Sequence, residues 1–66
     1  MNNLSHLSPR TLELCAYHAN EVANDLHDKA SLAGMQGDHC REAELRAAAD
    51  VERQAAQRYQ AALLLA

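Results

Sequence analysis

Apolar residues recur at helical spacing in two stretches of this chain, which are separated by Gly34-Met35-Gln36-Gly37. Both runs advance in alternating steps of four and three residues, the spacing that keeps side chains on one side of an α-helix. The pattern predicts an all-α fold, a two-helix antiparallel hairpin. The first run is Leu12, Ala16, Ala19, Ala23, Leu26, Ala30 and Ala33, and the second is Leu45, Ala49, Glu52, Ala56, Tyr59 and Leu63.

Residues typical of helix ends place the boundaries of this hairpin. Ser8 is a favoured N-cap, and Pro9 suits the first position of a helix. Gly34 is predicted to be the left-handed residue that ends the first helix, with Met35 folding back on the last turn. Asp38 is a candidate N-cap for the second helix. The predicted segments are a tail at 1–7 and a hairpin domain at 8–66, made of a helix at 9–33, a turn at 34–37 and a helix at 38–65.

Small apolar residues also lie beside each run, so the apolar arc of each helix is wider than one neighbouring helix requires. Cys15 and Val22 widen the first arc, and a second stripe widens the other: Cys40, Ala47, Ala48, Val51, Ala55 and Ala62. Two adjacent seams imply two neighbours for each helix, and a hairpin supplies only one. We therefore predict a homodimer that forms a coiled-coil-type four-helix bundle. The predicted core and dimer seam comprises Leu12, Cys15, Ala19, Val22, Leu26, Leu45, Val51, Ala55, Tyr59 and Leu63.

Charge and length restrict the partners and the compartment. The net charge is −3 with acidic and basic residues intermixed, so no basic patch favours nucleic acid. No apolar run approaches the roughly 18 residues of a membrane span, and the first residues lack the basic and apolar regions of a secretory signal. We expect a cytoplasmic protein with reduced thiols. Five Arg, one Lys and abundant Ala suggest a GC-rich bacterial or phage genome.

Few residues suggest chemistry. The chain has no Gly-rich phosphate loop and no Gly-x-Ser-x-Gly or His-Glu-x-x-His motif, so we expect neither an enzyme nor a cofactor. Cys15 and His18 would lie roughly 25 Å from His39 and Cys40 in one hairpin, too far to share a metal. We therefore expect the cysteines to be small core residues and no metal site. In an antiparallel dimer Cys40 would approach Cys15 of the mate, so a Cys/His metal or thiol sensor is one alternative.

The Ser8-Pro9 helix start, the two long heptad-bearing helices and the single short turn resemble the Rop family of small plasmid RNA-binding regulators over most of the chain. The resemblance implies that two hairpins dimerise into an antiparallel bundle. It also implies a second alternative function, that of an RNA-binding regulator.

A mixed apolar and polar patch is expected on the outside of the first helix. Tyr17 falls on the far side from the apolar arc, and exposed tyrosines often anchor interfaces. The predicted partner-binding residues are Leu14, Tyr17, His18, Glu21 and Leu64. These observations together predict a small non-enzymatic protein–protein interaction module. It would be an inhibitor or adaptor encoded by a phage or plasmid, which masks the surface of a host protein in a defence or regulatory pathway.

Overall fold

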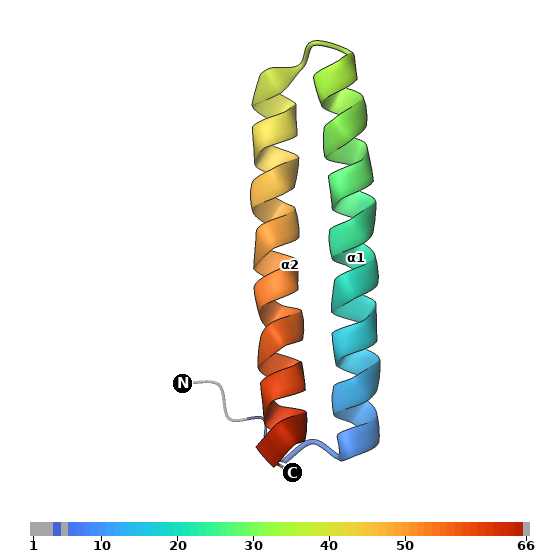
Figure 1. Cartoon of the computed structure of the whole chain (residues 1–66), viewed down its shortest axis with the longest axis vertical. Coiled ribbons are helices and arrows are strands. Elements are labelled where there is room, and N and C mark those ends of the chain that lie inside the picture. The colour runs from blue at the N-terminus through green and yellow to red at the C-terminus, as the bar shows by residue number, and fades with distance from the viewer. Residues whose placement is uncertain (1–3, 5, 66) are drawn as a thin grey trace.

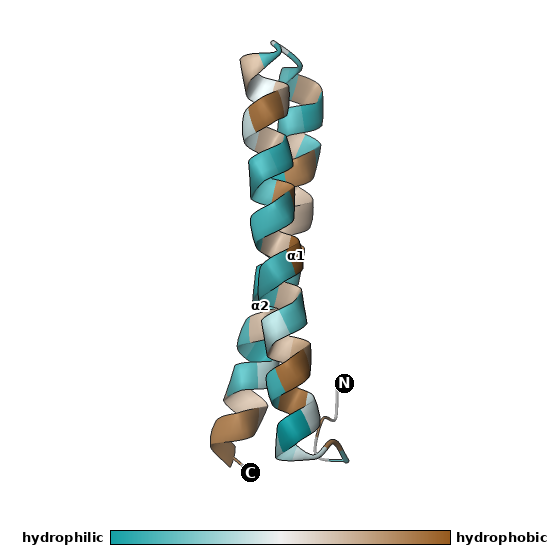
Figure 2. Cartoon of the chain, turned by 90° about the vertical axis from the view of Figure 1, so that its right-hand side faces the viewer, coloured by the Kyte–Doolittle hydropathy of each residue, from teal (hydrophilic) through white to brown (hydrophobic). Residues whose placement is uncertain are grey.

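Two α-helices account for nearly all of the computed structural model, which describes residue 4 and residues 6–65 (Figure 1). Helix α1 spans Pro9–Met35 and helix α2 spans His39–Leu65, with 27 residues in each. The helices run antiparallel and side by side, so the start of α1 and the end of α2 lie at the same end of the molecule (Figures 1 and 2). The predicted all-α hairpin is confirmed.

The described part of the chain is elongated, with Cα extents of 45 × 21 × 13 Å. Within residues 6–65 neither helix is long and apolar enough to cross a membrane. Residues 1–3, 5 and 66 lie outside the described residues, and so do the parts of the predicted tail (1–7) and of the predicted domain (8–66) that fall on them.

Both helices begin at the predicted N-caps. Ser8 has an extended backbone (φ −69°, ψ 155°), and its Oγ accepts a hydrogen bond from the Thr11 backbone N–H at 3.2 Å. Asp38 caps α2 in the same way, because its Oδ1 accepts from the Arg41 backbone N–H at 3.1 Å. Each cap satisfies a backbone donor that the first turn of a helix leaves without a partner.

The end of α1 differs from the prediction. Gly34 is helical, and the residue with a positive φ is Gly37, at 81°. Two backbone bonds close the turn around it: Gly37 N–H donates to the Gly34 carbonyl at 3.0 Å, and Asp38 N–H donates to the Ala33 carbonyl at 2.9 Å. This pair of bonds is the Schellman motif. It gives hydrogen-bond partners to the carbonyls of Ala33 and Gly34, which lie in the last turn of α1.

The helix bounds shift accordingly. Helix α1 continues two residues beyond the predicted 9–33, and α2 begins at His39, one residue later than predicted. Met35 does not fold back on the last turn as predicted; it stays helical and its side chain is 85% exposed. The link between the helices therefore consists of residues 36–38.

The two apolar runs form the contact between the helices. The fully buried side chains of the described residues belong to one leucine and seven alanines: Leu12, Ala16, Ala19, Ala23, Ala30, Ala33, Ala49 and Ala56. Larger members of the runs are half-buried at the margin: Leu26, Leu45, Glu52, Tyr59 and Leu63. Alanine allows two helices to approach closely, but it contributes little apolar area.

Gly34 makes room for a side chain of the other helix. A Cβ at this position would lie 2.7 Å from Oε2 of Glu42 and 2.8 Å from its Cδ. Replacing a helical glycine with alanine normally stabilises by about 0.5–1 kcal/mol. We expect Gly34→Ala to give this gain only together with Glu42→Ala, because in the parent chain the new methyl group displaces the Glu42 carboxylate. A double-mutant cycle in urea measures this coupling, and equal effects of Gly34→Ala in both backgrounds would contradict it.

Candidate interaction surface

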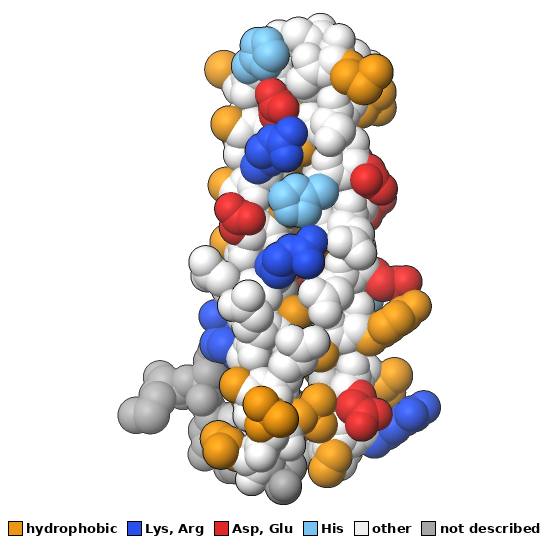
Figure 3. Space-filling model, viewed as in Figure 1, with side chains coloured by type: hydrophobic (Ala, Val, Ile, Leu, Met, Phe, Trp, Pro, Cys, Tyr) orange, Lys and Arg blue, Asp and Glu red, His pale blue; other side chains and the backbone are white. Residues whose placement is uncertain are grey.

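Among the large apolar side chains of the described residues, more are exposed than fully buried. Within residues 6–65, seven are exposed, by 54% to 89%: Leu14, Tyr17, Leu32, Met35, Val51, Leu64 and Leu65. Hydrophobic side chains gather over both helices at the end of the molecule opposite the turn (Figure 3). Hydropathy along the outside of the hairpin is mixed, and the last turns of α2 are its most apolar stretch (Figure 2).

One long side of the hairpin is polar. It is made by the residues that directly follow the members of the two runs, most of which are polar, among them Asn24 on α1 and Arg46 and Arg53 on α2. The Arg53 guanidinium donates from Nη2 to Asn24 Oδ1 at 3.1 Å, which joins the two helices on this side. Charged and histidine side chains form a line down the upper half of the face seen in Figure 3. We call this the polar side.

Glu42 is the centre of an ion cluster near the turn. Its Oε1 lies 3.1 Å from Nδ1 of His39, and its Oε2 lies 2.9 Å from Nη2 of Arg46, four residues further along α2. Hydrogen bonds from Arg46 and then from His39 hold the pKa of the Glu42 carboxyl below its usual value of 4.5. The cluster lies beside Gly34, so it also fixes the approach of α2 to the end of α1.

The lowered pKa of Glu42 predicts a pH dependence of stability. A carboxyl whose pKa is lowered by folding stabilises the fold above its unfolded pKa, and this contribution disappears as the pH falls through the lower folded value. We expect Glu42→Gln to lower the melting temperature at about pH 6 and to have little effect at about pH 3. The matched control is Glu13→Gln, since Glu13 is exposed. Parallel melting profiles of the parent chain and Glu42→Gln across this range would contradict the assignment.

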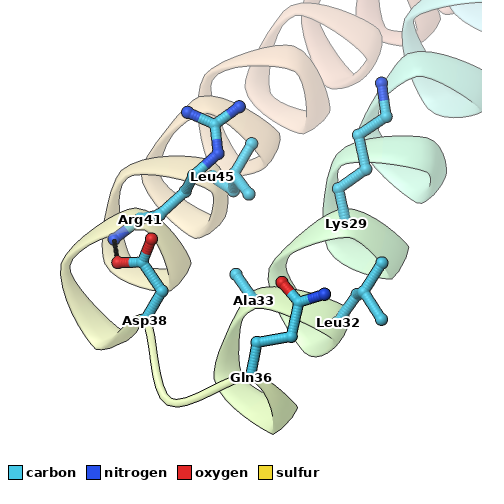
Figure 4. Close-up of a pocket in the computed structure, with 7 residues that line it drawn as sticks. All are labelled: Lys29, Leu32, Ala33, Gln36, Asp38, Arg41 and Leu45. Atoms are coloured by element: carbon cyan, nitrogen blue, oxygen red, sulfur yellow. Dashed lines mark hydrogen bonds between the residues drawn. The ribbon is translucent and has the colours of Figure 1, made fainter.

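A shallow hollow of about 180 Å³ opens on the other long side of the hairpin, close to the turn. In Figure 4 Lys29 and Leu32 extend from α1 and Arg41 and Leu45 extend from α2 around it, with Gln36 and Asp38 at the link. The sequence prediction did not include this hollow. The sequence holds one indication of the hollow, because Lys29, Leu32 and Arg41 each directly precede a residue on the packed face of their helix. This spacing predicts a shared site only when the length of the turn between the helices is known.

The predicted seam residues take different depths in the hairpin. Leu12 and Ala19 are fully buried, whereas Val51 is 61% exposed. The remaining seven are half-buried: Cys15, Val22, Leu26, Leu45, Ala55, Tyr59 and Leu63. The hairpin alone therefore covers only part of the predicted seam.

The predicted partner-binding residues all lie outside the core. Leu14, Tyr17, His18 and Glu21 are exposed within two successive turns of α1, and Leu64 is exposed in the last turn of α2 at the same end. The Glu21 carboxylate accepts a hydrogen bond from the Tyr17 hydroxyl and raises the pKa of Tyr17. This bond joins side chains one turn apart and leaves the tyrosine ring accessible.

Cysteine and histidine side chains do not converge. Both cysteines are free; Cys15 is half-buried and Cys40 is exposed. The described residues contain no group of three or more His, Cys, Asp or Glu side chains placed to hold a metal ion. A metal or thiol sensor formed between two chains stays a prediction.

Comparison of the chain with protein-family models, with curated proteins and with solved structures gives no significant match.

Proposed function

We propose that this chain is a non-enzymatic protein–protein interaction module, in which two hairpins pair into a four-helix bundle and the outside of the bundle binds a second protein. The observation that carries the proposal is the content of the core. In the described part of the chain, one leucine and seven alanines are buried, while seven large apolar side chains stay exposed. A chain of this size has a stability close to zero unless more apolar area is buried, and a second set of helices supplies that area.

The outside of α1 is the proposed surface for the second protein. Leu14 and Tyr17 present apolar area, and His18 and Glu21 surround them with polar groups. Apolar anchors inside a polar rim are typical of protein interfaces. The module would act by covering a surface of its target. We propose that it does so in the cytoplasm, as an adaptor or inhibitor of phage or plasmid origin.

An RNA-binding regulator has less support. Three of the six basic residues already have partners: Lys29 Nζ lies 3.0 Å from Asp25 Oδ2, Arg46 pairs with Glu42, and Arg53 binds Asn24. Phosphate contacts would have to compete with these bonds, and the net charge of −3 repels the RNA backbone.

The first experiment is light scattering across a dilution series, with circular dichroism on the same samples. We expect a helical dimer whose helicity falls as it dissociates, because the bundle contributes much of its stability. A fully helical monomer throughout the series would overturn the four-helix bundle.

The outer surface is tested with Leu14→Ala and Tyr17→Ala, and Gln54→Ala is the matched control on the exposed side of α2. We expect all three variants to keep the dimer mass and helicity, since these side chains lie outside the seams. Proteins retained from a bacterial extract should be lost with the two α1 variants and kept with Gln54→Ala. Identical retention by all four proteins would exclude this patch.

A further inference from the structure

The long side of the hairpin opposite the polar side has a distinct composition. Each of its residues directly precedes a core residue, so it is rotated by about 100° from the core line. On α2 this line reads Glu44, Ala48, Val51, Ala55, Arg58 and Ala62. The line on α1 is more mixed and reads Thr11, Cys15, His18, Val22, Asp25, Lys29 and Leu32. We call this the apolar side.

The structure places these lines of α1 and α2 on the same side of the hairpin. The hollow near the turn is lined by Lys29 and Leu32 of α1 together with Arg41 of α2, and all three directly precede positions on the packed faces. The Asn24–Arg53 hydrogen bond independently places the residues that follow core positions on the opposite side. In a square four-helix bundle, the two neighbours of each helix are about a right angle apart. The apolar side therefore faces the direction of a second neighbour.

Resting on the proposed dimer, we infer that the apolar side is covered by a second copy of this chain whose turn lies at the opposite end, with Val51 of the two copies facing each other. Val51 is 61% exposed in the hairpin. Glu44 precedes it by seven residues and Arg58 follows it by seven. When two α2 helices pack antiparallel about Val51, Glu44 of each copy faces Arg58 of the other, which gives two ion pairs across the interface.

Both charges are available for this pairing. Glu44 and Arg58 are exposed, and neither has an ion-pair partner in the part of the chain that the structure describes. Ala48 and Ala55 lie between them on the same line, so the centre of the contact is small and apolar with charges at its ends.

The register on α1 is compatible with the same two-fold axis. Asn24 and Arg53 lie within about one helical turn of the same level, because their side chains are hydrogen-bonded. The helices run in opposite directions, so Leu26, two residues after Asn24, lies within the same distance of the level of Val51, two residues before Arg53. Leu26 is half-buried and would meet Leu26 of the second copy beside the axis. Asp25 lies next to it with its charge compensated by Lys29 at 3.0 Å.

The available area is sufficient for a stable dimer. The broad dimensions of the hairpin are 45 Å and 21 Å between Cα atoms. A standard interface buries roughly 800 Å² per partner, which is about a sixth of the 4813 Å² surface of the chain.

The alternative arrangement, with both turns at one end, lacks this complementarity. It would place α1 of one copy beside α2 of the other at equal height, as within the hairpin. Arg58 would then lie beside Ala19 and His18, and Val51 beside Leu26 and Asp25, so Arg58 would gain no opposite charge. Glu44 would come near only Lys29, whose charge is already compensated by Asp25 at 3.0 Å. The positions of the charges therefore favour turns at opposite ends.

Charge reversal tests the inference. Glu44→Arg and Arg58→Glu each create two like-charge contacts per dimer, and we expect each to raise the dimer dissociation constant by about tenfold or more at low salt. The combined variant, with both reversals, restores two ion pairs and should recover the parent dissociation constant. Asp50→Arg, an exposed reversal on another side of α2, is the matched control and should leave the dimer intact.

Disulfide trapping gives a second measurement that does not depend on the strength of the ion pairs. In a chain with Cys15→Ser and Cys40→Ser, we expect Val51→Cys to form a covalent dimer under mild oxidation, and Gln54→Cys not to. The opposite result is a dimer that resists both charge reversals and is crosslinked between Asp25→Cys of one chain and Val51→Cys of the other. Such a dimer has its turns at one end. This result overturns the inference but leaves the proposed dimer standing. A parent chain that is a helical monomer at every concentration overturns the proposed dimer itself.

Discussion

Leu12→Ala is expected to leave most of the chains unfolded at room temperature. Among the residues that the structure describes, Leu12 is the only large side chain that is fully buried, with 2% of its surface exposed. Truncating a buried leucine costs about 2–5 kcal/mol, including the cavity that remains. A single core in a chain of this size rarely supplies more than about 3–5 kcal/mol, so the loss removes most of it.

The measurement is urea unfolding followed by helical circular dichroism, at one fixed chain concentration because dimer formation is coupled to folding. Leu14→Ala is the matched control in the same turn of α1, where the side chain is 54% exposed. It should cost less than about 1 kcal/mol. Equal losses for the two variants would mean that Leu12 does not fill the contact between the helices.

Ala23→Leu is expected to have the second largest effect. Ala23 has no exposed surface, and the fully buried residues of α2 that form the opposite face are also alanines, Ala49 and Ala56. Three additional carbons have no room between helices that approach this closely. Overpacking of this kind costs about 1–3 kcal/mol, and the helices would have to separate along their middle.

Ala47→Leu makes the same change at an exposed position of α2 and is the control for Ala23→Leu. It should change the stability by no more than about 0.5 kcal/mol. If Ala23→Leu melts at the same temperature as Ala47→Leu, the close alanine contact at the centre of the hairpin is wrong.

The packed face of α1 was predictable because its alanines are restricted to one stripe. Every alanine of α1 is fully buried, from Ala16 to Ala33, so small size and helical spacing agree. Helix α2 is less informative, since alanine also occurs at exposed positions such as Ala43, Ala47 and Ala61. Composition alone cannot separate an alanine that packs from one that only favours a helix.

The turn and the register between the helices could not be predicted from local pattern. Gly34 and Gly37 are equally able to adopt a positive φ, and the choice depends on which one closes two backbone hydrogen bonds and leaves Asp38 free to cap α2. A shift of the turn by one or two residues changes which side chains face each other across the hairpin. The Asn24–Arg53 bond and the hollow at Lys29 and Arg41 therefore emerged only with the structure.

The alanine contact has a consequence for how stability varies with temperature. The heat capacity change of unfolding grows with the apolar area that unfolding exposes. A core of one leucine and seven alanines exposes little area, so the change should be smaller than the average of about 12–15 cal/mol/K per residue. The stability of the hairpin by itself should then change with temperature along a broad curve of low curvature.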